Sequence, residues 1–409
     1  MGEKNIFRAY VIRPDSIRFQ EIESEKGIIA SVTDSDPTEK TSVYKYSRNK
    51  LVFPGIVDTH VHARQDVRGA KNYKETFATA ARAAIRGGVA AFMDMPNNDA
   101  PPVDRQSYEA KKELVESQNL PIEIVLYAGI NKDSEPFSDD IPYKCFIGES
   151  TGSASLFFSD EKSLDESMRR YMGQYVSYHC ELASIIESNK NKDAHESRRP
   201  AEAETEAIRI ALEMIAKYDI KGTICHISTA KGLELAENAK KSGLDIAVEI
   251  TPHHLYFDRT RKYMSLHQGL LKMNPPLREP EDRLALLDAM KSSELEIRWG
   301  SDHAPHTFEE KMQSNPSGVP TLDTTGQMIC WLIEQGIPPQ RLAKIFHDSG
   351  RFMSRFSKKQ YGDIVQGYAA KFTVLETDIQ NTVEKEDLQT KCRWSPWEDI
   401  MFGGRAKLI

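Results

Sequence analysis

Eight short apolar segments, rich in β-branched residues, alternate with longer segments of helical character through the middle of the chain. This alternation is typical of a parallel sheet whose strands are connected by helices. Eight such units over roughly 250 residues have the size of a (β/α)8 barrel. We therefore expect an α/β fold, a (β/α)8 TIM barrel, with strands within residues 54–62, 88–97, 121–130, 142–150, 175–182, 222–229, 245–255 and 296–305.

The segments between these strands include six with a helical pattern, at residues 73–86, 104–118, 161–173, 201–218, 230–242 and 281–291. The crossovers after the third and fourth strands are short or irregular. A doubly wound open sheet is the main alternative, but it would concentrate its ligand contacts at one topological switch point.

The two ends of the chain lie outside the predicted barrel, which we place at residues 51–358. Both ends are polar and contain short alternating stretches, at residues 27–32 and 370–375, of the kind that form half-buried strands. We expect residues 1–50 and 359–409 to form one small β-sandwich module together.

The composition limits the classes of partner. The chain has 409 residues, a formal net charge of -7 and no basic run with interleaved aromatics, which argues against nucleic-acid binding. No segment approaches the ~20 apolar residues that span a bilayer, and the first residues lack the apolar core of a signal peptide. The five cysteines form no CxxC pair, which favours reduced thiols in a cytoplasmic protein. A homodimer is compatible with the sequence, which does not define the oligomeric state.

Residues whose side chains can bind metal or substrate lie where the predicted strands end. The active site of a (β/α)8 barrel lies at the C-terminal ends of its strands. The candidate residues at these ends are His60, His62, Asn97, Lys144, His179, His226 and Asp302. Imidazoles and a carboxylate in this arrangement suit a site for two zinc ions.

His60, His62 and Arg64 occupy alternating positions at the end of the first apolar strand, so their side chains can point to one face. Two neutral imidazoles suit a divalent metal, and the guanidinium group suits an anion. A lone His-x-His pair can equally be a pair of surface or hydrogen-bonded histidines. The residues at the other strand ends therefore distinguish between the two interpretations.

Lys144 is the unusual member of the set, because an ammonium group cannot coordinate a cation. Burial lowers the pKa of an amine, and the neutral amine can add carbon dioxide to give an anionic carbamate that bridges two metals. The alternative is a substrate-binding or ion-paired lysine. Cys145, Cys180 and Cys225 each adjoin a candidate ligand, and strand alternation predicts that all three thiols face away from the ligands.

Several motifs, in the same order along most of the chain, resemble those of the dihydroorotases of the amidohydrolase superfamily. The motifs are FPGIVDTHVHAR at residues 53–64, DMPN at 94–97, YKCFIGESTG at 143–152, HCE at 179–181, CHIST at 225–229, TPHHL at 251–255, MNPPLR at 273–278 and SDHAPH at 301–306. Many dihydroorotases continue after the arginine with an acidic residue, proline and glycine, whereas this chain has QDVRG at residues 65–69. The shape of this first loop is therefore expected to differ.

The resemblance implies a role for each matching residue. The implied metal ligands are His60, His62 and Asp302 for one Zn²⁺, His179 and His226 for the other, and N6-carboxylated Lys144 as the bridge. Asp302 would also act as the catalytic proton shuttle. The implied substrate-binding residues are Arg64, Asn97, Asn274, His306 and Gly318. The implied reaction is the reversible hydrolysis of a small molecule, (S)-dihydroorotate, to N-carbamoyl-L-aspartate by a metal-bridging hydroxide, in de novo pyrimidine (UMP) biosynthesis.

Other cyclic amidohydrolases resemble the chain in these metal ligands. Dihydropyrimidinases and hydantoinases act on rings without a carboxylate and usually lack the arginine, whereas allantoinases are a closer alternative. Arg64, Asn97 and Asn274 favour a dihydroorotase. A non-catalytic dihydroorotase-like assembly subunit is an alternative from another class, but such a subunit would not need the complete ligand set. His253 and His254 are expected to support neighbouring residues rather than bind metal.

Overall fold

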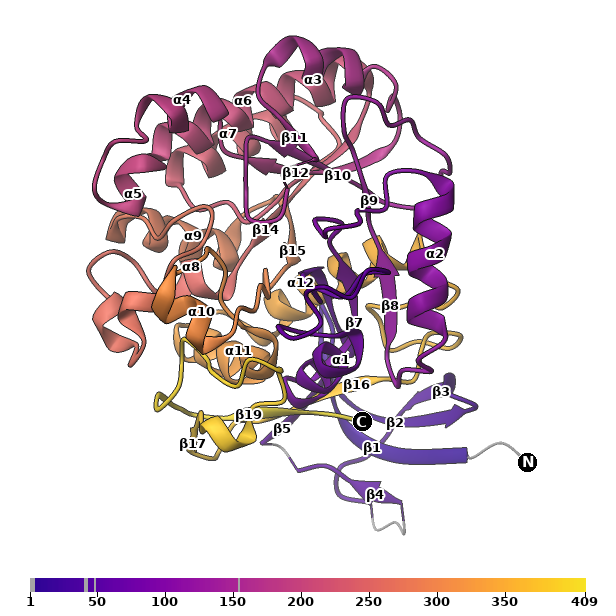
Figure 1. Cartoon of the computed structure of the whole chain (residues 1–409). Helices are drawn as coiled ribbons and strands as arrows, with labels where there is room; N and C mark the ends of the chain where they lie inside the picture. Colours follow the sequence, from indigo (N-terminus) through magenta and orange to yellow (C-terminus); the bar gives the residue numbers. More distant parts are fainter. Residues whose placement is uncertain (1–3, 40–42, 48, 154) are drawn as a thin grey trace.

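A ring of parallel strands occupies the centre of the protein in the computed structural model, which describes residues 4–39, 43–47, 49–153 and 155–409 (Figure 1). Each of the eight predicted segments coincides with a strand of this ring, although β13 begins one residue before its segment. The strands are β6 (Ile56–Val61), β7 (Val89–Asp94), β8 (Glu123–Leu126), β10 (Tyr143–Ile147), β12 (Tyr175–Cys180), β13 (Lys221–Ile224), β14 (Ile246–Ile250) and β15 (Glu296–Trp299).

Hydrogen bonds connect the ring in two arcs, β6-β7-β8 and β10-β12-β13-β14-β15. The arcs meet at β9 (Ala128–Gly129), which follows β8 directly and pairs with the start of β10 on the edge opposite β12, while β11 (Phe157–Phe158) pairs with the end of the same edge. The ring closes beyond β15, where His303 bridges to Val61 and its carbonyl accepts the backbone N–H of His62 at 2.8 Å. The (β/α)8 barrel is therefore confirmed, and the open sheet is not formed.

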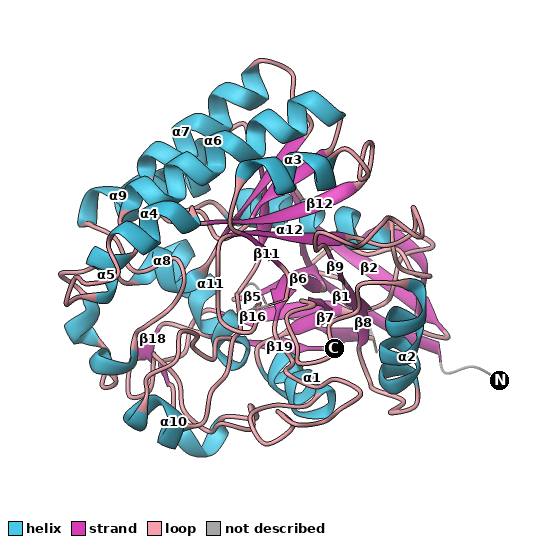
Figure 2. Cartoon of the chain, turned by 45° about the horizontal axis from the view of Figure 1, so that its top comes forward, coloured by secondary structure: helices cyan, strands magenta, loops and turns pink. Residues whose placement is uncertain are grey.

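The six predicted helices are confirmed, and a seventh long helix follows the last strand. These helices are α1 (Phe77–Arg86), α2 (Arg105–Glu116), α3 (Glu161–Met168), α6 (Ala201–Tyr218), α7 (Ala230–Lys241), α9 (Pro280–Ser292) and α12 (Pro339–Ser354). Helix α1 begins four residues later than residue 73, because the Thr76 side chain caps it by accepting the Thr79 N–H. Helices surround the strands in Figure 2.

The remaining helices lie in the other connections of the barrel and in the C-terminal segment. They are α4 (Ala183–Ser188), α5 (His195–Arg198), α8 (Pro252–Tyr256), α10 (Phe308–Gln313), α11 (Thr325–Glu334), η1 (Lys262–Met264), η2 (Gln268–Leu270), η3 (Leu322–Thr324) and η4 (Lys385–Asp387). In the described part of the chain, no helix has the length and apolar character needed to cross a membrane.

A second sheet joins the two ends of the chain (Figure 1). Its strands run in the order β19 (Arg405–Leu408), β16 (Phe372–Glu376), β5 (Lys50–Pro54), β1 (Lys4–Ile12), β2 (Ile17–Glu25) and β3 (Ile28–Asp34), with β4 (Tyr44–Lys45) beside β1. Strands β3 and β16 confirm the two alternating stretches. Strands β17 (Asn381–Thr382) and β18 (Met401–Phe402) form a separate pair. The module boundaries and its sandwich arrangement stay predictions, and residues 1–3, 40–42 and 48 of it lie outside the described residues.

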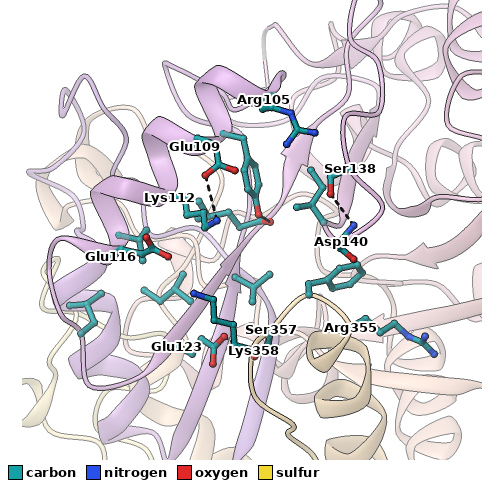
Figure 3. A pocket seen from close by; sticks show the side chains of 18 of the residues that line it. Arg105, Glu109, Lys112, Glu116, Glu123, Ser138, Asp140, Arg355, Ser357 and Lys358 are labelled. Atoms are coloured by element: carbon teal, nitrogen blue, oxygen red, sulfur yellow. Dashed lines mark hydrogen bonds and ion pairs between the residues drawn. The ribbon is translucent and has the colours of Figure 1, made fainter.

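A large hollow lies on the outer wall of the barrel rather than at the strand ends. It has a volume of about 720 Å³, is open to solvent, and is bordered by α2, β8 and residues 355–358 (Figure 3). It exists because the connection from β9 to β10, residues 130–142, contains no helix to cover this wall. Its rim mixes acidic and basic side chains, such as Glu109 and Lys112, which pair at 3.4 Å. No predicted site residue lines it.

Candidate metal and substrate site

A smaller cavity opens at the C-terminal ends of the barrel strands. Its lining comprises His60, His62, Arg64, Asn97, Phe146, Ser150, Thr151, His179, His226, Asn274, Asp302, Ala304, Ser317 and Gly318. Two predicted site residues lie outside this lining. Lys144 is fully buried on β10, and His306 lies behind Arg64.

One group of ligand atoms converges at the end of β6. The Nε2 atoms of His60 and His62 lie 3.4 and 3.0 Å from Asp302 Oδ1. Burial lowers the pKa of both imidazoles and raises the pKa of the Asp302 carboxyl group. Neutral imidazoles present lone pairs, so three donor atoms of the kind that zinc prefers meet within 4.8 Å of one another.

His179 at the end of β12 and His226 after β13 form a second group. His179 Nδ1 lies 3.0 Å from His226 Nε2, and burial lowers the pKa of both imidazoles. Two nitrogens bound to the same tetrahedral zinc ion at its usual bond length lie ~3.3 Å apart. The His226 ring lies 5.3 Å from the His60 ring, centre to centre, so the two groups are adjacent. The residues present therefore fit two neighbouring metal ions.

Lys144 lies beside both groups without a carboxylate in ion-pair contact, although its charge acts on the nearby carboxylates of Glu249 and Asp302. Its side chain is fully buried, and its Nζ donates a hydrogen bond to Cys225 Sγ at 2.9 Å. Within the described chain it forms no ion pair, and it does not line the cavity. These observations argue against both alternatives, an ion-paired lysine and a substrate-binding lysine. A carbamate on Nζ would replace this isolated buried amine with an anionic ligand facing the metals.

The orientation of Cys225 corrects one expectation. Cys145 and Cys180 pack in the hydrophobic core around the barrel, as strand alternation predicts. Cys225 instead points inward to Lys144. Alternation does not apply there, because β13 ends at Ile224 and His226 has a left-handed φ of 38°.

Buried carboxylates hold the far sides of two ligand histidines. Glu249 on β14 accepts hydrogen bonds at 2.8 Å from His60 Nδ1 and from Thr59. Burial opposes ionisation of Glu249, but the neighbouring His60 and these hydrogen bonds lower its pKa to about 2. Glu181 lies 3.4 Å from His179 Nε2 and pairs with Arg199. Sequence reasoning missed Glu249, although an acidic residue within an otherwise apolar strand was a usable signal.

Arg64 brings an unpaired positive charge to the cavity. Its side chain is only 4% exposed, its Nε donates to the Pro305 carbonyl at 3.2 Å, and no carboxylate of the described chain pairs with it. Burial lowers its pKa to about 10, so the guanidinium group stays charged at neutral pH. Its backbone φ of 61° differs from that of a regular strand and turns the side chain at the strand end. A buried cation without a partner is suited to an anionic ligand.

Two asparagines complete the polar lining of the cavity. Asn97 donates to the Thr151 carbonyl at 2.8 Å, and Asn274 lies 3.4 Å from Ser150 Oγ. The Oδ1 atoms of both asparagines are buried and have no hydrogen-bond partner in the described protein. The Gly318 N–H is already bound to the Lys272 carbonyl at 2.8 Å, which holds this loop against the cavity.

The two histidines of the TPHHL motif lie outside both ligand groups. His254 bonds to Thr251 Oγ1 at 2.8 Å and to the Pro275 carbonyl at 3.1 Å, next to Asn274. His253 is buried and packs against the His254 ring. Their position agrees with the expected supporting role.

Comparisons with known proteins show the family of the chain. The model of the amidohydrolase family matches residues 51–330. A dihydroorotase of Pyrococcus furiosus is 31% identical over 365 residues, which cover 88% of this chain and 80% of the relative. A dihydroorotase of Thermococcus kodakarensis is 32% identical over 387 residues, which cover 93% of this chain and 87% of the relative.

Solved structures show the same fold. The L-hydantoinase of Arthrobacter aurescens superposes with a TM-score of 0.88 at 21% identity, covering 100% of this chain and 95% of the other. A dihydropyrimidinase of Brevibacillus agri gives a TM-score of 0.83 at 20% identity, covering 98% and 92%. At this level of identity, the similarity concerns the fold alone.

Proposed function

The chain belongs to the amidohydrolase family and, within it, to the dihydroorotases, and we propose that it hydrolyses (S)-dihydroorotate reversibly to N-carbamoyl-L-aspartate in de novo pyrimidine synthesis. The observation that carries the substrate assignment is Arg64, a buried guanidinium group at the cavity without a carboxylate partner in the described chain. Dihydroorotate has a ring carboxylate that can accept two parallel hydrogen bonds from this group. Dihydrouracil and hydantoin have no such carboxylate.

The proposed cofactor is a pair of Zn²⁺ ions. His60, His62 and Asp302 would hold one ion, His179 and His226 the other, and N6-carboxylated Lys144 would connect them. When bound, such a pair lowers the pKa of water and polarises the carbonyl group that is attacked. The support from this chain is the convergence of neutral imidazole nitrogens beside an unpaired buried amine.

Asp302 is the proposed acid and base. Its carboxylate lies at the cavity and is held by His60 and His62, and burial raises its pKa. A carboxyl group with a raised pKa can accept the proton of the attacking water and return it to the departing ring nitrogen. The same residue serves the reverse reaction, because one transition state is shared by both directions.

The remaining polar groups would orient the ring. The unpartnered Oδ1 atoms of Asn97 and Asn274 can accept hydrogen bonds, and the loop at Gly318 bounds the cavity. Together with Arg64 and His306, they would hold the substrate so that the scissile amide faces the metals. Fixing the reacting groups in this way lowers the entropic part of the barrier.

We place the activity in the cytoplasm, because all five cysteines are free thiols. The other cyclic amidohydrolases are less suited to this site. Their carboxylate-free rings would leave the Arg64 charge buried and unpaired. A non-catalytic subunit would not need the imidazole groups that converge here.

A substrate panel tests the function. Protein expressed with zinc and bicarbonate is assayed with dihydroorotate, carbamoyl-aspartate, dihydrouracil, hydantoin and allantoin. We expect turnover of dihydroorotate and carbamoyl-aspartate only, and loss of turnover after chelation. Efficient hydrolysis of dihydrouracil, hydantoin or allantoin would contradict the assignment. A protein that binds no zinc and turns over none of the five would indicate the non-catalytic subunit.

A further inference from the structure

We propose that Lys74 is a positioning residue that fixes the proton of the His306 imidazole on Nε2, and thereby prepares His306 to donate to the substrate carboxylate. The kinetic part of this inference rests on the proposed function. Lys74 lies in the loop between β6 and α1 and is 8% exposed. No motif in the sequence singled it out.

The geometry at His306 Nδ1 permits only one arrangement of the proton. Lys74 Nζ lies 3.1 Å from Nδ1. An ammonium group has donors but no acceptor, so Nδ1 must offer its lone pair and the proton must be on Nε2. Glu310 is the only other polar side chain placed near Nδ1 in the described structure, and its Oε2 is 3.7 Å away, which is too far for a hydrogen bond.

Glu310 instead keeps Lys74 charged and in place. Its Oε1 pairs with Lys74 Nζ at 2.9 Å and also accepts the Tyr73 hydroxyl at 2.6 Å. Burial and the positive charges of Arg64 and Lys71 lower the pKa of Lys74, and Glu310 opposes them. Burial and the positive charges of Arg64, Lys74 and Lys311 lower the pKa of His306, so its imidazole is neutral and its tautomer matters.

The other edge of the imidazole faces the cavity lining. His306 Nε2 lies 3.1 Å from the Ser317 carbonyl, which accepts its proton, and 3.4 Å from Arg64 Nη2, which is itself a donor. Ser317 and Arg64 both line the cavity. A carboxylate held by Arg64 would therefore meet a second N–H donor, which it would share with the Ser317 carbonyl in a three-centre hydrogen bond. The opposite tautomer would turn a lone pair toward the anion and toward the Ser317 carbonyl.

The tautomer can be read directly in the unaltered protein. Histidine labelled with ¹⁵N gives different nitrogen shifts for protonated and unprotonated ring positions, and His306→Gln identifies the signals of His306. We expect an unprotonated Nδ1 and a protonated Nε2 in the zinc-loaded wild type. A protonated Nδ1 would overturn the inference. This readout needs no substrate, so it is separate from the proposed function.

Variants then test the consequence for binding. Lys74→Met removes the donor at nearly constant size, and we expect a His306 tautomer mixture and a KM for dihydroorotate raised about 10- to 100-fold, with kcat changed less than about 3-fold. Lys74→Arg should restore the tautomer and most of the affinity. Lys71→Met is the matched control, because it removes a lysine from the same loop that pairs with Asp99 instead.

Two results would overturn the role of Lys74. One is Lys74→Met with the wild-type tautomer, and the other is Lys74→Met with a KM equal to that of Lys71→Met. A wild-type protein that does not turn over dihydroorotate would refute the proposed function, while the tautomer measurement would still decide the positioning of His306.

Discussion

At the scale of single residues, the side chains of the site are themselves held in place by hydrogen bonds from neighbouring side chains. The imidazole of His60 is oriented by Glu249, and that of His306 by Lys74. Such partners fix both the direction and the tautomer of a functional histidine. The position of a ligand at a strand end is therefore only part of what the sequence encodes.

Glu249→Gln should weaken zinc binding about 10- to 100-fold, because both oxygens of Glu249 accept hydrogen bonds, from His60 Nδ1 and from Thr59, whereas an amide is neutral and offers only one acceptor oxygen. The pKa of about 2 keeps Glu249 ionised throughout the usual pH range, so the loss should not depend on pH above 5. Zinc affinity is measured by competition with a chelator. Glu234→Gln, on the exposed face of α7, is the control and should bind as the wild type does. Equal affinities of Glu249→Gln and the control would refute the orienting role.

The sequence predicted the residues that have a chemical signature and a strand end to place them. His60, His62, His179, His226 and Asp302 lie together because the strands of a barrel end on one face. The sequence analysis missed residues that act on the site only through a contact formed in the folded chain. Lys74 resembles any loop lysine until the fold brings it to His306, which is 232 positions away in the sequence.

At the scale of elements, the periodic pattern was a reliable guide within strands and helices but not beyond their ends. All eight barrel strands and six helices were predicted. The inward turn of Cys225 was not, because it lies one residue past the end of β13, where side-chain alternation no longer applies.

In the end module, one carboxylate forms ion pairs with residues of two neighbouring strands. Glu376, at the end of β16, accepts from Arg405 on β19 at 2.8 Å and pairs with Lys50 on β5 at 3.0 Å. Burial opposes ionisation, but these hydrogen bonds and the charges of Arg405 and Lys407 lower the pKa of Glu376 to about 2. One carboxylate thus joins strands from both ends of the chain.

Glu376→Gln should lower the free energy of unfolding by about 1 to 3 kcal/mol at pH 7. A carboxyl group with a lowered pKa in the folded state stabilises it fully above the ordinary value of 4.5, and this contribution is lost as the pH falls toward 2. The difference between wild type and variant in urea denaturation should therefore shrink between pH 4.5 and 2. Glu386→Gln, at an exposed position, is the control. A difference that stays constant over this range would contradict the assignment.

At the scale of the whole molecule, the barrel and the end module were predictable because each follows from local patterns. The outer hollow was not predicted, although the irregular crossover after the third strand was noticed. The hollow lies where a helix after the third strand would have covered the barrel. Its place can be known only from the arrangement of α2, β8 and residues 355–358 in space. The barrel leaves the functional cavity small and polar, with one buried cation at its edge.

The central claim is that this cation selects a carboxylate-bearing ring. The most direct measurement is the ratio of kcat/KM for dihydroorotate to that for dihydrouracil in zinc-loaded wild type and Arg64→Ala, with Arg68→Ala as an exposed control from the same loop. We expect a strong preference for dihydroorotate in the wild type and the control. In Arg64→Ala, kcat/KM for dihydroorotate should fall by about 100-fold or more at unchanged zinc content, since the substrate carboxylate would lose its buried partner. An unchanged kcat/KM in Arg64→Ala, or equal turnover of both substrates by the wild type, would contradict the account.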